Sequence, residues 1–127
     1  MLPASEIEYQ LPAGLPRLVT YEAKWVPDSV YYGGTPAVCP AVNVSEGLAA
    51  RMRGLALGAW RAVGCRDYAR VDMRLDAGGE PRILEVNPNP DISPDAGLAR
   101  AAGKGGLAYD ELIAGIARSA AARGGGR

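Results

Sequence analysis

The 127-residue sequence contains no histidine and only two cysteines. Without histidine, the chain lacks the residue that most often serves as a general base and as a zinc ligand. Ser-His-Asp, Cys-His and histidine-metal chemistry are therefore excluded within this chain. Cys39 and Cys65 form no CxxC motif, so we expect reduced thiols that pack as small apolar side chains.

The sequence also lacks a net charge and a long apolar run. Fourteen Lys and Arg residues balance fourteen Asp and Glu residues, and no basic stripe is present, which argues against a nucleic-acid surface. No segment is long and apolar enough to span a membrane, and no signal peptide is evident. We expect a soluble, cytoplasmic protein that binds neither nucleic acid nor membrane.

A β-hairpin is predicted in the middle of the chain. Two segments with strand alternation, residues 68–75 and 82–87, flank a short loop that contains glycine, a composition typical of hairpins. Side chains on a strand alternate between its faces. The first strand is therefore expected to carry Tyr68, Arg70, Asp72 and Arg74 on one side, and the second strand to carry Ile83, Glu85 and Asn87 on one side.

Two acidic residues are expected to face each other across this hairpin. With a loop of residues 77–80, antiparallel pairing sets Asp72 opposite Glu85 and Arg70 opposite Asn87. Opposed carboxylates repel unless a cation lies between them. Side-chain oxygens of this kind suit Mg²⁺ or Mn²⁺, which leave their other positions to phosphates and water. The pattern therefore suggests a metal site that binds a nucleotide.

The same pattern also fits a charged strand face that is simply solvated. Two prolines that follow the second strand, Pro88 and Pro90, favour the cation site. Proline does not continue a central strand and fixes an extended exit, which presents a rigid loop beside the carboxylates.

These motifs resemble the end of the ATP-grasp domain in D-alanine–D-alanine ligases. The resemblance depends on Arg70-Val-Asp72 followed by Leu84-Glu85-Val-Asn87-Pro. It extends over most of the chain through three further segments: residues 21–25 (Tyr-Glu-Ala-Lys-Trp), residues 39–41 (Cys-Pro-Ala) and residues 109–113 (Tyr-Asp-Glu-Leu-Ile). The resemblance implies part of an ATP-dependent carboxylate–amine ligase that acts through an acyl phosphate.

The resemblance also implies a metal site and its ligands. Asp72 and Glu85 would hold Mg²⁺ or Mn²⁺, with Glu85 bridging two ions and Asn87 completing the second. Three residues would bind the nucleotide. Arg70 and Lys24 would be catalytic and contact the phosphates of ATP, and Trp25 would help close the site as a lid.

Two positions depart from the pattern of the resembled family. An alignment without gaps from Asn87 places Asp91 where the family has glycine, and Ala96 where it has the serine that meets the second D-alanine. The departures argue against D-alanyl-D-alanine as the product. Asp91 would either help recognise an amino group or place a negative charge near a helix N-terminus.

The predicted fold is α+β, an antiparallel sheet with helices packed on one face, as in the C-terminal half of an ATP-grasp domain. We expect residues 1–122 to form this subdomain and residues 123–127 to be a disordered tail. The predicted strands cover residues 6–9, 18–24, 68–75 and 82–87. The predicted helices start at Ser45, Ser93 and Asp110, and residues 25–40 form a long loop. The first helix is expected to stop at Gly64 and to carry a core stripe of Leu48, Met52, Leu55, Ala59 and Val63.

The chain opens on a strand with no preceding element, so we expect a C-terminal fragment that is inactive by itself. The expected partners are ATP, small amino-acid or carboxylate substrates and the N-terminal half of the same protein; a homodimer is compatible with this prediction. Two alternatives stay open. One is a noncatalytic α+β binding domain with a structural cation site. The other, a glycosidase-type carboxylate pair, lacks an aromatic sugar platform.

Overall fold

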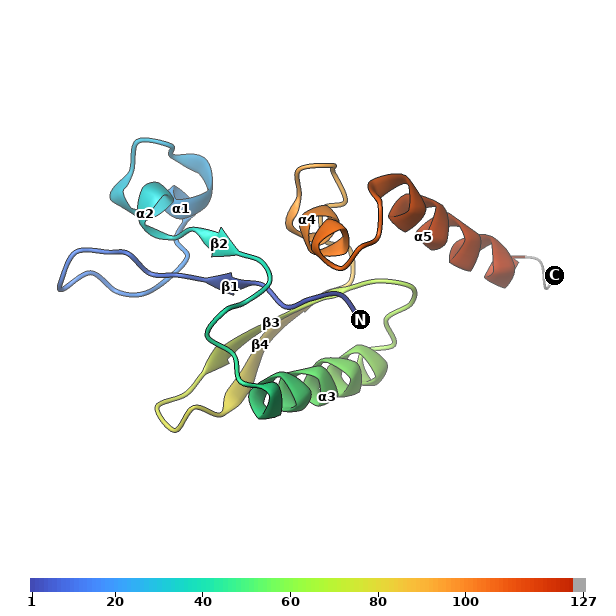
Figure 1. Cartoon of the computed structure of the whole chain (residues 1–127), viewed down its shortest axis with the longest axis horizontal. Helices are drawn as coiled ribbons and strands as arrows, with labels where there is room; N and C mark the ends of the chain where they lie inside the picture. Colours follow the sequence, from blue (N-terminus) through green and yellow to red (C-terminus); the bar gives the residue numbers. More distant parts are fainter. Residues whose placement is uncertain (125–127) are drawn as a thin grey trace. The chain divides into compact units, whose positions relative to one another are not determined.

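A computed structural model of the protein describes residues 1–124. The chain divides into two compact units (Figure 1). The smaller unit is Ala4–Val42, and the larger one combines Met1–Pro3 with the chain from Asn43 onward. Within the described range, no helix combines the length and the apolar character that a bilayer crossing requires.

The smaller unit contains a two-stranded sheet and two short helices. Strand β1 (Glu6–Ile7) pairs antiparallel with β2 (Ala37–Val38), and helix α1 (Tyr21–Trp25) contacts α2 (Val30–Gly34). The strand predicted for residues 18–24 is therefore wrong. The physical reason is a cap, because the Thr20 hydroxyl accepts a hydrogen bond from the Ala23 N–H at 3.3 Å and starts a helix there.

The loop predicted for residues 25–40 is also wrong, since α2 and β2 both lie within it. Ser29 caps α2, and its hydroxyl oxygen accepts a hydrogen bond from the Tyr32 N–H at 3.0 Å. Local side-chain caps thus order a segment whose content of proline, glycine and tyrosine suggested irregular structure.

The first helix of the larger unit is α3 (Glu46–Ala62), as predicted. The Ser45 hydroxyl accepts a hydrogen bond from the Leu48 N–H at 3.3 Å and caps the helix. Gly64 follows the helix with φ +67°, and its N–H donates to the Arg61 carbonyl at 3.1 Å. Together with a bond from Cys65 N–H to Trp60 carbonyl at 3.0 Å, this is a Schellman motif. The predicted stop at Gly64 is confirmed.

A hairpin follows α3, with strand β3 (Arg70–Leu75) paired antiparallel to β4 (Pro81–Asn87). Helix α3 packs against both strands (Figure 1). The α+β class is confirmed, because helices and antiparallel strands are both present. The single sheet that the sequence predicted is wrong, since the described strands form two separate pairs, β1 with β2 and β3 with β4.

Two helices complete the larger unit, α4 (Gly97–Lys104) and α5 (Tyr109–Gly124), and they contact each other. The helix start predicted at Ser93 is wrong, because the Ala96 N–H donates to the Ser93 carbonyl at 2.9 Å and closes a β-turn. Proline suits the second position of such a turn as well as the first turn of a helix, so Pro94 allowed both interpretations.

Helix α5 begins one residue before the predicted start. Its first turn is closed by Glu111, whose carboxylate accepts a hydrogen bond from the Ala108 N–H at 3.1 Å. The helix includes Arg123 and Gly124, which were assigned to the tail, and the remaining tail residues lie outside the described range.

The buried apolar side chains of the described residues all belong to the larger unit. The predicted core stripe of α3 is correct only in part. Leu48 is buried, whereas Leu55 is 40% exposed and Val63 is 61% exposed. The core members are Leu48, Cys65, Ala99, Ala101, Ala102 and Leu112.

Two glycines, one inside α3 and one just after its end, should respond to the same substitution with opposite signs. Gly64→Ala should lower the free energy of unfolding by about 1–2 kcal/mol, because an L-residue is disfavoured in the left-handed region. Gly54→Ala should raise it by about 0.5–1 kcal/mol, since Gly54 lies in the helix interior and an added Cβ meets no atom within 4 Å. Urea unfolding of both variants measures these effects. Equal shifts of the same sign would contradict the assigned helix end.

Candidate functional site

The β3–β4 hairpin carries the candidate site. Arg70 lies opposite Asn87 and Asp72 opposite Glu85, so the predicted cross-strand pairs are confirmed. Directly opposed residues have Cβ atoms about 5 Å apart. Four of the six residues predicted for the site therefore come from one pair of strands, two from each.

A β-bulge in β4 produces this arrangement. Near the loop, Leu75 pairs with Pro81 and Met73 with Ile83, whereas the next pair is Asp72 with Glu85. Leu84 is thus an extra residue without a partner on β3, and its side chain is 67% exposed.

The bulge also corrects the predicted faces of β4. Ile83 pairs with Met73, the neighbour of Asp72 on β3, and successive strand residues point to opposite faces. Ile83 therefore does not share the side of Glu85 and Asn87, as the simple alternation predicted. The two carboxylates still lie on one face.

Asp76 organises the loop of the hairpin, and the sequence analysis missed this role. Its Oδ1 accepts hydrogen bonds from the N–H groups of Gly78 at 2.9 Å and Glu80 at 3.0 Å. Its Oδ2 accepts a bond from Arg82 Nε at 2.9 Å. The Glu80 N–H and, after it, the Arg82 side chain hold the pKa of Asp76 below its ordinary value. An Asp that precedes Gly-Gly in a short loop is the signal that could have indicated it.

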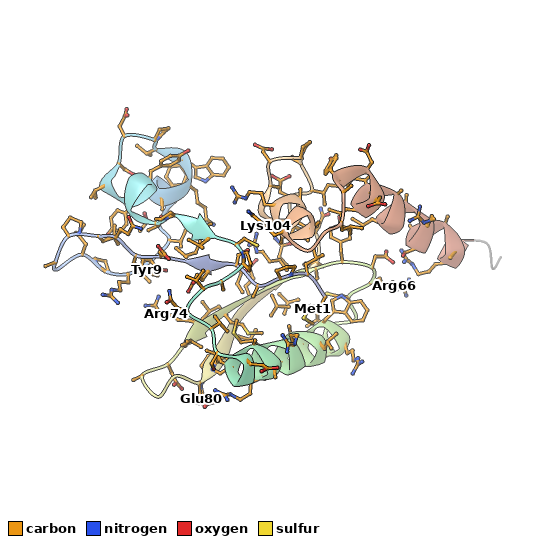
Figure 2. The ribbon with its side chains drawn as sticks, in the orientation of Figure 1. Met1, Tyr9, Arg66, Arg74, Glu80 and Lys104 are labelled. Carbon is orange, nitrogen blue, oxygen red and sulfur yellow. The ribbon has the colours of Figure 1, made fainter. Side chains whose placement is uncertain are left out.

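Glu80, labelled in Figure 2, lies in the same loop. Its Oε2 is 3.6 Å from Arg51 Nε of α3, and both side chains are about half exposed, 56% and 51%. Such an exposed pair contributes little stability, but it shows that the loop lies beside α3.

The loop should make hairpin stability depend on pH. A carboxyl with a lowered pKa in the folded state stabilises the fold above its unfolded pKa, about 3.9, and loses that contribution as the pH falls through the folded value. Asp76→Asn should therefore be less stable than the unmodified chain at pH 7 and equally stable near pH 2. Thermal unfolding at both pH values measures this difference. Asp95→Asn, which changes an exposed carboxylate outside the hairpin, is the control, and a gap that persisted at pH 2 would contradict the assignment.

Arg70 and Asp72 form a bidentate ion pair on β3. Arg70 Nε donates to Asp72 Oδ1 at 2.7 Å, and the terminal nitrogen Nη2 donates to Oδ2 at 2.9 Å. The hydrogen bond to Asp72 raises the pKa of Arg70, and the charge of Glu85 adds to this effect. One guanidinium thus compensates two carboxylates that face each other.

The other predicted metal ligands are accessible. Glu85 is exposed and Asn87 is half-buried. The Asn87 Oδ1 accepts a hydrogen bond from the Asn89 N–H at 2.9 Å, which fixes the amide group of Asn87. A carbonyl oxygen has a second lone pair, so Oδ1 can still accept a cation.

The donor set fits a hard divalent cation. Among the residues that the structure describes, no three or more His, Cys, Asp and Glu side chains gather in a way that could hold a metal by themselves. Mg²⁺, however, is usually held by one or two carboxylates, with phosphates and water at its other positions. Asp72, Glu85 and the amide oxygen of Asn87 provide such a set.

Lys24 and Trp25 lie in the smaller unit, at the end of α1. Both are exposed, and Trp25 is 68% exposed. They are on a helix and not at the end of a strand as predicted. An exposed lysine and an exposed indole on one helical turn are available to a ligand.

Tyr68 and Asn89 were not identified as interacting residues from the sequence. Tyr68 Oη donates a hydrogen bond to Asn89 Oδ1 at 2.9 Å. The bond joins the residues before β3 to those after β4 and so closes the open end of the hairpin. An asparagine between two prolines is the only signal in the sequence, and it does not reveal the partner.

Asp91 and Ala96 are the two residues that depart from the family pattern, and each lies in a locally defined structure. Asp91 Oδ1 accepts hydrogen bonds from the hydroxyl of Ser93 at 2.6 Å and from its N–H at 2.8 Å, which together lower the pKa of Asp91. Ala96 is the N-cap of α4 and makes no side-chain cap. Asp91 thus forms a turn with Ser93 and lies several residues before the helix.

Residues 3–118 match the family described as "D-ala D-ala ligase C-terminus". The chain belongs to this family, whose fold is ATP-grasp. The matched residues include α1, the whole hairpin and α4. The coarser part of the sequence prediction, an ATP-grasp region of the D-alanine–D-alanine ligase type, is thereby confirmed.

Similar proteins agree with this assignment. The chain is 38% identical over 110 residues to the uncharacterized protein y4sG of Sinorhizobium fredii, covering 87% of this chain and 31% of the relative. It is 35% identical over 103 residues to the D-alanine–D-alanine ligase of Bordetella petrii, covering 81% of this chain and 30% of that enzyme. The chain thus spans about a third of the length of the curated relatives it matches.

Two crystal structures of the D-alanine–D-alanine ligase from Bacillus anthracis share the fold. One aligns with a TM-score of 0.66 and 25% identity over 93% of this chain and 34% of that enzyme. The other, a complex with ATP, aligns with a TM-score of 0.58 and 29% identity over 61% of this chain and 27% of the enzyme.

Proposed function

We propose that the chain is the metal- and nucleotide-binding part of an ATP-dependent carboxylate–amine ligase that acts through an acyl phosphate. The observation that supports this proposal is the facing pair Asp72 and Glu85 beside Arg70, within a chain of the ligase family. A related ligase was crystallised with ATP, which supports ATP as the nucleotide.

Asp72, Glu85 and Asn87 would hold Mg²⁺ or Mn²⁺ on the exposed face of the hairpin. The cation would neutralise negative charge on the phosphates of ATP. Arg70, on the same face, would bind the phosphoryl group that is transferred to the substrate carboxylate. Such transfer depends on positioning and on charge neutralisation more than on acid–base groups, and the chain has no histidine.

Lys24 and Trp25 would bind the nucleotide from helix α1. A lysine contributes a compact positive charge for a phosphate. The exposed indole of Trp25 would cover the nucleotide and exclude water. The adenine site and the rest of the catalytic centre would come from the N-terminal part of the longer protein, as the one-third coverage of the relatives suggests.

The substrates would differ from the D-alanine pair. Asp91 places a carboxylate, with its pKa lowered by Ser93, where the resembled family has glycine, and Ala96 offers no hydroxyl. A carboxylate at this position disfavours a second negative charge nearby. We therefore propose an amine substrate other than D-alanine.

Glu85→Gln tests the cation site. The variant keeps the shape of the side chain but removes one of the two facing charges, so it should weaken Mn²⁺ binding by about tenfold or more. Calorimetry or electron paramagnetic resonance with Mn²⁺, in the presence of ATP, measures the affinity. Glu80→Gln, a change of the same kind in the hairpin loop, is the matched control and should bind as tightly as the unmodified chain. Equal binding by both variants would overturn the metal assignment.

Arg70→Gln should change cation binding in the opposite direction. Both oxygens of Asp72 accept hydrogen bonds from Arg70, so the guanidinium competes with a cation when no nucleotide is bound. Since the pair is about half exposed, 51% and 37%, the gain in Mn²⁺ affinity should be modest, about two- to fivefold.

Arg82→Gln is the control for Arg70→Gln, because it removes a positive charge and an ion pair, that with Asp76, from the same hairpin. Its Mn²⁺ affinity should not change. Weaker Mn²⁺ binding by Arg70→Gln would show that Arg70 orients Asp72 for the cation and does not compete with it.

A further inference from the structure

Two hydrogen bonds connect Tyr68 to the predicted metal ligand Asn87. Tyr68 Oη donates to Asn89 Oδ1 at 2.9 Å, and the Asn89 N–H donates to Asn87 Oδ1 at 2.9 Å. Asn89 is thus held at its side chain by one residue and at its backbone by the other. A displacement of Asn89 would alter the orientation of the Asn87 amide.

The two prolines leave this turn with few backbone hydrogen-bond donors. Pro88 and Pro90 have no N–H, so Asn89 supplies the one backbone donor of residues 88–90, and that donor is used by Asn87. The Asn89 side chain is exposed and would rotate freely without its bond to Tyr68. The hydroxyl of Tyr68 is therefore the contact that fixes Asn89 from outside the turn.

Tyr68 is itself held in place. Its N–H donates to the Arg66 carbonyl at 2.8 Å, closing a turn whose central residue, Asp67, has φ +62°. A positive φ is costly for a residue with a Cβ and persists where other contacts enforce it. Asp67 forms an ion pair with Arg123 of α5, and its side chain is only 14% exposed. The last helix thus stabilises the turn from which Tyr68 reaches Asn89.

We propose that Tyr68 is a positioning residue: its hydroxyl, acting through Asn89, orients the Asn87 amide oxygen toward the face of the hairpin that binds the cation. The inference rests on the proposed cation site, to which it adds a residue that does not touch the metal. One lone pair of Asn87 Oδ1 accepts the Asn89 N–H, and the other is left for the cation. Partners of this kind tune affinity by holding a ligand in its binding orientation.

Tyr68→Phe tests the inference, because it removes the hydroxyl and keeps the half-buried ring. Mn²⁺ binding should weaken by about three- to tenfold, the effect of one lost hydrogen bond behind a ligand. Amide hydrogen exchange gives a second measurement that needs no metal. The Asn89 N–H should exchange faster in the variant, while exchange in α3 should not change.

Two further variants separate positioning from general destabilisation. Tyr109→Phe, at the start of α5, removes a hydroxyl for which no hydrogen bond is found within the described part of the chain, and should leave Mn²⁺ affinity and Asn89 exchange unchanged. Asn89→Ala should weaken Mn²⁺ binding, and adding Tyr68→Phe to it should cause little further loss, since both changes break the same bond.

The outcomes distinguish the inference from the proposed function. If the unmodified chain binds Mn²⁺ neither with ATP nor without it, the cation site is wrong. If it binds but Tyr68→Phe binds equally well, or if the effects of Tyr68→Phe and Asn89→Ala simply add, the positioning role is overturned and the cation site stands.

Discussion

The register of the β3–β4 hairpin is the constraint on which the candidate site depends. The loop pairs Leu75 with Pro81, and if that register continued without a break, Asp72 would lie opposite Leu84 and Glu85 opposite Val71. The two carboxylates would then point to opposite faces, because a shift of one residue reverses every side chain on a strand. The bulge at Leu84 supplies the missing residue and returns Glu85 to the face of Asp72. Bulges commonly occur beside functional sites for this reason.

The same register creates an electrostatic problem that Arg70 resolves. Directly opposed residues have Cβ atoms about 5 Å apart, and two like unit charges at such a separation repel each other by roughly 1–3 kcal/mol when the effective dielectric constant is 20 to 80. Arg70 neutralises Asp72 directly and Glu85 at longer range, so the hairpin tolerates both charges without a metal. The arrangement is consistent with a site in which a cation and a phosphate replace that ion pair when the nucleotide binds. Burial is moderate at these side chains, so the exchange requires little desolvation.

The cross-strand pairing of the candidate residues was more predictable from the sequence than the fold around them. Alternation and loop composition correctly paired Asp72 with Glu85, although the predicted register placed Pro81 opposite Asp76 and not opposite Leu75, and the bulge was missed. The two errors cancelled. The Asp76 N–H donates to the Glu80 carbonyl at 3.0 Å, so these two residues face each other at the base of the turn, which the Asp76 carboxylate also holds. The extra residue Leu84 then restores the register. Neither the capping bonds of Asp76 nor the position of a bulge is visible in hydrophobic alternation, because both depend on how two strands meet.

The helices could be predicted only where contacts between neighbouring residues define their ends. Ser45 and Gly64 bound α3 through contacts within a few residues, so both ends could be predicted. Residues 18–24 were misassigned because Leu, Val and Thr favour strands, whereas the Thr20 cap and contact with α2 favour a helix. The Tyr68–Asn89 bond spans 21 positions and could not be predicted from either segment alone.

Hydrogen bonds from backbone N–H groups distinguish the Asp and Asn side chains that hold turns from the two facing carboxylates of the candidate site. Asp76, Asn87 and Asp91 each accept a hydrogen bond from the backbone N–H two positions later, at 2.9, 2.9 and 2.8 Å, and thereby hold turns. Such bonds are the usual reason for Asp and Asn in loops and require no ligand. Asp72 instead accepts from the side chain of Arg70, and Glu85 lies exposed opposite it. The hairpin thus places two carboxylates face to face without using them for backbone hydrogen bonds. In the proposed site a cation would bind between them, and Asn87 would serve both as turn residue and as ligand.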